Sequence, residues 1–186
     1  MIVIPSPPHP VKYFIGALFS DETLLKEAVE QCTNCFGAVD FTSEQFLFES
    51  TDYYEPEMGS PIHRQFFSFE NLKNPSLLAT AKIQTNNIEQ DVKTSGTRKV
   101  NLDIGYMDFH KIVLASAKYN GQKIYLDHGI YADPTLYYEK GQFYPHDWAF
   151  PDFQETEQYY PALLRIRELY KLQLKNAQSQ DKPNSD

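Results

Sequence analysis

Cysteine, glycine and tryptophan are scarce in this 186-residue chain, which contains 2, 8 and 1 of these residues. Cys32 and Cys35 alone cannot supply the four ligands of a structural zinc site, and the five histidines are scattered along the chain. No glycine-rich phosphate loop occurs, neither GxxxxGK nor GxGxxG, and GxSxG and HExxH are missing too. The familiar P-loop, dehydrogenase and hydrolase classes therefore lose their support.

Long hydrophobic runs are also missing. No window approaches the roughly 18 consecutive apolar residues of a membrane span. The opening MIVIPSPPHP lacks the basic start and the apolar run of a secretory signal. We therefore expect a cytoplasmic protein that has no membrane partner.

Positive charge is in short supply, with 17 Lys and Arg against 25 Asp and Glu and a net charge of -8. Because affinity for nucleic acid depends on neutralising phosphates, a nucleic-acid partner is disfavoured. The sequence does not indicate an oligomeric state, a substrate or a reaction.

The two cysteines form a CxxC pair near the end of a predicted helix. Redox pairs usually lie at a helix N-terminus, where the helix dipole lowers the thiol pKa. We therefore expect one buried and one half-buried thiol, with no metal or redox role.

Aromatic residues are abundant, at 15% with 13 Tyr and 13 Phe, and they favour a strand-rich core. We expect an extended arm at residues 1–10, a single α+β domain at 11–176 and a disordered tail at 177–186. Hydrophobic periodicity and capping residues predict strands and helices in alternation. The strands are expected at 11–19, 39–50 and 62–71, and the helices at 21–36, 75–94 and 161–176.

These elements make two βα units, which an antiparallel meander follows. We expect a mixed or antiparallel sheet with the helices on one face, and a ferredoxin-like core is our preferred topology. Asn120-Gly121 predicts a hairpin between flanking strands, and Lys140-Gly141 predicts another.

In the Asn120-Gly121 hairpin, Lys118 would face Lys123 across the strands. Like charges in that position destabilise a sheet, so either an anion lies between the lysines or both extend into water. The core face would carry Val113, Ala115, Ala117, Ile124, Leu126 and His128. The polar face would carry Ser116, Lys118, Lys123, Tyr125 and Asp127.

The segment TDYYEPEMG, residues 51–59, is predicted to be a loop between two strands. Its carboxylates, Asp52, Glu55 and Glu57, are candidates to bind a hard cation such as Mg²⁺. Alternatively they pair with Arg64 or with the hairpin lysines. Tyr53 and Tyr54 are expected to pack across the sheet.

Several motifs carry a family resemblance: TDYYEPEMG, FFSFENL, RKVNLDIGY, KIVLASAK, IYLDHGIYADPTL and WAFPDF occur in this order. Over residues 10–174 the chain resembles an uncharacterised prokaryotic domain-of-unknown-function family of about 180 residues, whose members are often labelled "GTP-binding protein". The resemblance implies no established activity. It marks these polar positions as distinctive: Asp52, Tyr53, Tyr54, Glu55, Glu57, Asn101, Asp103, Gly105, Tyr106, Lys118, Tyr125, Gly129 and Tyr131.

Two functions of different classes remain. The first is binding of, or action on, a small phosphorylated molecule such as a nucleotide, with Asp103 and Lys118 as the central and candidate catalytic groups. Its predicted ligand-binding residues are Asn101, Lys118, Lys123, Tyr125, Asp127, Tyr53 and Tyr54. The alternative is a non-catalytic protein–protein interaction module, in which HDWAFPDF contacts a partner. A concave pocket that joins residues 51–59 to the lysines favours the first, whereas a flat face with exposed Trp148 and Phe150 favours the second.

Overall fold

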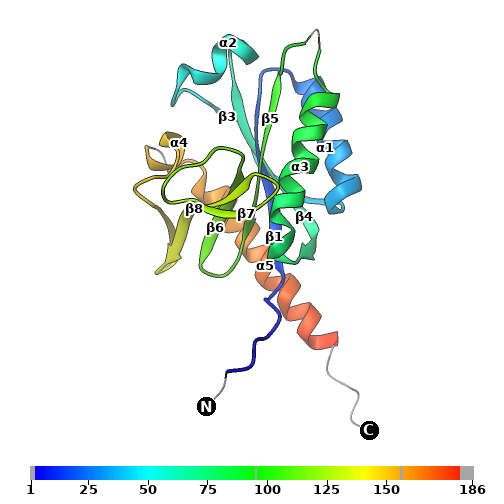
Figure 1. The fold of residues 1–186 in the computed structure, drawn as a ribbon, viewed down its shortest axis with the longest axis vertical. Coiled ribbons are helices and arrows are strands. Elements are labelled where there is room, and N and C mark those ends of the chain that lie inside the picture. Colours follow the sequence, from blue (N-terminus) through cyan, green and yellow to red (C-terminus); the bar gives the residue numbers. More distant parts are fainter. Residues whose placement is uncertain (1–2, 95, 156, 181–186) are drawn as a thin grey trace.

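The computed structural model describes residues 3–94, 96–155 and 157–180. Within them, nine strands form one antiparallel sheet in the order β2-β4-β1-β5-β6-β8-β7, while β3 pairs with β4 and β9 with β8 (Figure 1). The strands are β1 (Val11–Phe19), β2 (Val39–Thr42), β3 (Phe46–Leu47), β4 (His63–Lys73), β5 (Val100–Met107), β6 (Lys111–Ser116), β7 (Ile124–Asp127), β8 (Ile130–Glu139) and β9 (Gln142–Pro145). The predicted α+β class is confirmed.

Side-chain caps begin α1 (Glu22–Phe36) and the 3₁₀ turn η2 (Pro75–Leu77) that leads into α3 (Leu78–Asp91). The other helices are α2 (Glu55–Met58), α4 (Pro151–Gln154) and α5 (Tyr160–Gln180), with a second 3₁₀ turn η1 (Asp52–Tyr54). The Asp21 carboxylate accepts hydrogen bonds from the first backbone amides of α1, and Asn74 caps η2, which leads into α3. Residues 3–10 are exposed and have no helix or strand.

The first half of the sheet has the predicted ferredoxin-like topology. In chain order the elements run β1, α1, β2, β4, α3, β5, and in space the strands lie in the order β2-β4-β1-β5, all antiparallel. This is the split βαβ arrangement of a ferredoxin-like core. The strands β6 to β9 extend that sheet on its β5 side.

Helices cover both faces of the sheet, so the prediction that all three lie on one face was wrong. Tyr13 and Ile15 of β1 pack in the cluster beneath α1 and α3, whereas Phe14 packs with α4 and α5. All nine residues of β1 are buried, so both faces of this strand had to be covered.

A buried lysine holds α5 on its face. The ammonium of Lys12 donates to Asp40 of β2 at 2.6 Å and to Gln173 of α5 at 3.0 Å. Burial lowers the pKa of Lys12, and Asp40 opposes that shift. The helix α5 extends to Gln180, so the predicted start of the tail at residue 177 was wrong, and residues 181–186 lie outside the described residues.

The predicted Asn120-Gly121 hairpin was wrong. The strand β6 pairs with β8, and β7 pairs with the other edge of β8, so β6 and β7 are not neighbours. A strand has two edges, and the ten-residue strand β8 pairs with β6 along one edge and with β7 and β9 along the other. The backbone turn at Asn120 only reverses the chain locally. By contrast, the hairpin at Lys140-Gly141 is confirmed: it joins β8 to β9, with φ of 49° and 96° at the two turn residues.

The changed pairing also changes the predicted faces. Val113 and Ala115 are buried as expected, but the other four residues of the predicted core face are exposed: Ala117, Ile124, Leu126 and His128. Lys118 and Lys123 therefore do not oppose each other on paired strands.

Candidate ligand-binding cavity

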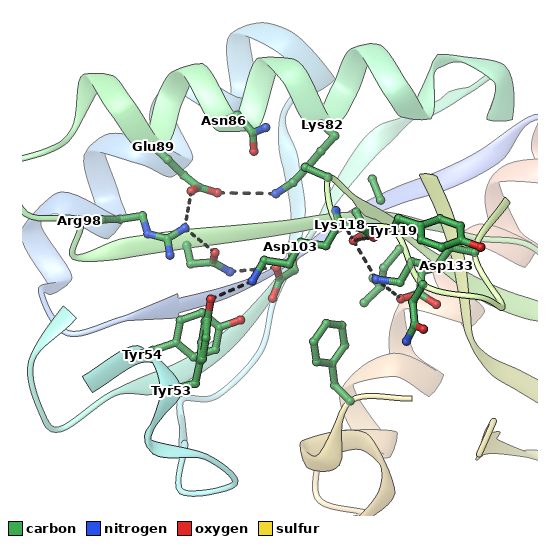
Figure 2. A pocket seen from close by; sticks show the side chains of 18 residues that line it. Tyr53, Tyr54, Lys82, Asn86, Glu89, Arg98, Asp103, Lys118, Tyr119 and Asp133 are labelled. Carbon is green, nitrogen blue, oxygen red and sulfur yellow. Dashed lines mark hydrogen bonds and ion pairs between the residues drawn. The ribbon is translucent and has the colours of Figure 1, made fainter. Parts of the chain in front are cut away.

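A cavity of about 380 Å³ lies between α3, β5, the segment after β6 and the 3₁₀ turn η1 (Figure 2). A second cavity of about 300 Å³ adjoins it, because the two share Tyr53, Tyr54, Asp103, Lys118 and Phe150 in their linings. Volumes of this size are at the lower end of the range for small-molecule pockets, about 300–1,000 Å³.

Residues 51–59 form one edge of the cavity as the turn η1 and the short helix α2. The Thr51 hydroxyl accepts a hydrogen bond from the Tyr53 amide at 3.1 Å, which begins the turn. Tyr54 is half-buried and its ring packs against Phe48, and this burial raises the pKa of the Tyr54 hydroxyl. The segment thus presents two tyrosine rings to the cavity.

The carboxylates of the same segment do not converge. Glu57 pairs with Arg98 at 2.8 Å, while Asp52 and Glu55 border a different hollow. Among the described residues, no three His, Cys, Asp or Glu side chains gather where they could hold a metal ion. Arg64, their other expected partner, pairs elsewhere.

The wall formed by α3 carries a charge network that sequence reasoning missed. Glu89 accepts hydrogen bonds from the Leu102 amide at 2.8 Å and from Arg98 at 3.0 Å. Lys82 donates to the Leu102 carbonyl at 2.9 Å and lies 3.8 Å from Glu89. The helical spacing of Lys82 and Glu89 was the available signal, because it places both on one face of α3.

Asp103 lies where the two cavities meet. It projects away from the buried side chains of Leu102 and Ile104, as strand alternation predicted. It accepts hydrogen bonds from Asn101 at 2.9 Å and from Arg64 at 3.4 Å. Its partners are therefore an amide and an arginine, not the lysines.

Arg64 is buried at the floor of the smaller cavity. Its Nε lies 2.8 Å from Asp152 of α4, and its guanidinium lies over Gly16, where a Cβ atom would come within 2.8 Å of the arginine. Burial alone lowers the Arg64 pKa, but Asp152 and Asp103 outweigh it and leave that pKa raised. Burial raises the Asp152 pKa, and Arg64 opposes that shift.

On the far wall, the half-buried Lys123 lies between two acceptors. Its ammonium lies 3.2 Å from Asp133 and donates to Ser116 at 2.9 Å. Burial raises the pKa of Asp133, against the effect of Lys123. Lys123 therefore has its charge balanced within the protein.

Lys118 differs from the other cationic groups of the cavity. Its ammonium donates to the Tyr53 hydroxyl at 2.9 Å, and this contact lowers the pKa of that hydroxyl (Figure 2). In the part of the chain that the structure describes, no carboxylate lies within ion-pair distance of Lys118, whereas Lys82, Arg98 and Lys123 each have one. One positive charge of the cavity is thus left without an anionic partner.

The cavity brings together most, but not all, of the predicted ligand-binding residues. Those that line it are Tyr53, Tyr54, Asn101, Lys118 and Lys123, and the candidate catalytic residue Asp103 lines it too. Tyr125 and Asp127 do not, because β7 lies at the edge of the sheet, where the Tyr125 ring contacts Tyr131 and Asp127 contacts His128.

The fold and the cavity define an α+β protein with an extended ferredoxin-like sheet and a polar, tyrosine-lined pocket. A family model described as "Domain of unknown function (DUF4416)" matches residues 9–170, and the chain belongs to that family. Comparisons with curated proteins and with solved structures found no match. Within the described residues, every helix is too short or too polar to cross a membrane.

Proposed function

We propose that the protein binds, or acts on, a small phosphorylated molecule, of which a nucleotide is one example, with the phosphate against Lys118. The observation that carries this proposal is the charge balance of the cavity. Its other cationic side chains have carboxylate partners, whereas Lys118 has the neutral hydroxyl of Tyr53. A lysine ammonium holds phosphate as a point charge, so an anionic ligand would complete this balance.

Asp103 is the group we propose for chemistry or for metal binding. It lines both cavities, and its side chain is 27% exposed, so a ligand at Lys118 could contact it. Mg²⁺ in such sites is commonly held by one or two carboxylates together with the phosphate itself. The Asp103 carboxylate would then supply the protein's ligand to Mg²⁺.

A calorimetric titration with ribose 5-phosphate and with adenosine monophosphate, each with and without Mg²⁺, tests the proposal. We expect Lys118→Met to weaken binding by about tenfold or more, equivalent to about 1.4 kcal/mol. Lys171→Met is the matched control, because Lys171 is exposed on α5 and lines neither cavity. Asp103→Asn should reduce the part of binding that needs Mg²⁺.

Two results would contradict the proposal. One is the absence of binding by both phosphorylated compounds at millimolar concentration. The other is equal affinity of Lys118→Met and Lys171→Met, which would mean that any loss came from net charge alone.

One observation favours the alternative of a protein–protein interaction module. The Trp148 side chain is 44% exposed and stacks on His146, with ring centroids 4.7 Å apart. Exposed tryptophans often contribute strongly to interfaces. Phe150, the other aromatic of this segment, instead borders both cavities. The cavity that Tyr53 and Lys118 line makes ligand binding the function we favour.

A further inference from the structure

Three side chains of α3 face the larger cavity at helical spacing: Lys82, Asn86 and Glu89 (Figure 2). Lys82 and Glu89 are paired within the network already described. The side-chain amide of Asn86 lies between them, yet no described residue is hydrogen-bonded to that side chain. The neighbouring Asn87 is exposed and lines neither cavity.

The stability of α3 does not explain why an asparagine occupies position 86. Asparagine is a poor helix former, and its usual value lies in caps and turns, where its side chain bonds to the backbone. Asn86 is in the interior of the helix and makes no such bond. What it offers is a hydrogen-bond donor and an acceptor side by side, half-buried at the cavity wall.

The remainder of the cavity is suited to a flat ring. Tyr53, Tyr119 and Phe150 line it and are all exposed enough to be contacted, at 64%, 72% and 45%. Aromatic rings of this kind stack favourably on nucleobases. A planar group with a donor and an acceptor on its edge would therefore be complementary to both the rings and the Asn86 amide.

We propose that Asn86 binds the donor–acceptor edge of a nucleobase, so that the ligand is a nucleoside monophosphate and not a plain sugar phosphate. This rests on the proposed function, since Lys118 would hold the phosphate. A single lysine without an anionic partner matches a monophosphate better than a longer, more highly charged chain. The side-chain amide can take either of two orientations, so it is complementary to any base edge that carries a donor beside an acceptor.

Dissociation constants for adenosine, guanosine, cytidine and uridine monophosphates, each compared with that for ribose 5-phosphate, test this inference. At least one nucleotide should bind the parent protein about tenfold more tightly than ribose 5-phosphate. Asn86→Ala should remove that advantage while leaving the affinity for ribose 5-phosphate unchanged. Asn87→Ala, the same change on the exposed side of the helix, should bind like the parent. Since alanine is the better helix former, neither variant should lose its fold.

Equal affinity of the parent for every nucleotide and for ribose 5-phosphate would overturn the inference. Equal effects of Asn86→Ala and Asn87→Ala would overturn it as well. Neither result touches the phosphate site, which fails separately if no compound binds or if Lys118→Met binds like the parent.

Discussion

At the scale of single residues, the two thiols of the CxxC segment have different environments. Cys32 is on the buried side of α1, and burial raises its pKa to about 12, whereas Cys35 is half-buried. At pH 8 a thiol with that pKa is ionised in roughly one molecule in 10⁴, so it should react very slowly with thiol reagents. We expect labelling of the native protein with a chromogenic disulfide to show one fast and one slow thiol, and Cys35→Ser to lose the fast phase.

The same variant tests the expectation that the pair binds no metal. Cys35→Ser should keep the fold and contain no less zinc than the parent. Two fast thiols, or stoichiometric zinc that disappears in Cys35→Ser, would mean that the cysteines act as a pair.

Cys32 also makes the free energy of unfolding depend on pH. Its raised pKa favours the native state below about pH 9, and this contribution is lost as the pH rises toward 12.

At the scale of elements, the ion pair between Arg64 and Asp152 fixes α4 against the sheet. Both side chains are almost fully buried, with 4% and 2% exposed. Removing one partner of a buried pair leaves the other charge uncompensated, at a cost of about 3–5 kcal/mol. We expect Asp152→Asn to lower the free energy of unfolding by about 3 kcal/mol, since Asp103 still contacts Arg64, as measured by urea denaturation.

The double variant Arg64→Met with Asp152→Asn provides the control. Without the arginine, no buried cation needs a partner, so the double variant should recover part of the lost stability. Two results would show that the pair does not hold α4. One is a loss of less than about 1 kcal/mol of unfolding free energy in Asp152→Asn. The other is a loss in the double variant that exceeds the sum of the losses in Arg64→Met and Asp152→Asn.

At the scale of the whole molecule, the sheet should differ in stability from its centre to its edge. The central strand β1 pairs with β4 and β5 and is buried on both faces, whereas β7 is an exposed edge strand. Amides of a central strand exchange with solvent only in rare, nearly global openings. Hydrogen–deuterium exchange followed by mass spectrometry should therefore find peptides of β1 slowest, with those of β7 and residues 3–10 much faster. Similar rates in β1 and β7 would contradict this order.

Much of the local structure could be predicted from the sequence. The strand at 11–19 and the helix ending at residue 36 follow from apolar periodicity and from the cap at Asp21. The Lys140-Gly141 turn follows from the positive φ angles that such a pair adopts in a hairpin turn. The outward direction of Asp103 follows from alternation along its strand. Each of these properties depends on residues close together in the chain.

The sequence by itself therefore determined the first strand and helix, the Lys140-Gly141 hairpin and the side of β5 on which Asp103 projects. Tertiary structure alone decided that β6 pairs with β8, that α5 covers the second face and that Arg64 pairs with Asp152. It also brought Lys118 to Tyr53, 65 positions away in the chain. Such contacts follow from how distant surfaces are buried against one another, and short-range periodicity carries no information about which distant partner a strand or a charge will meet.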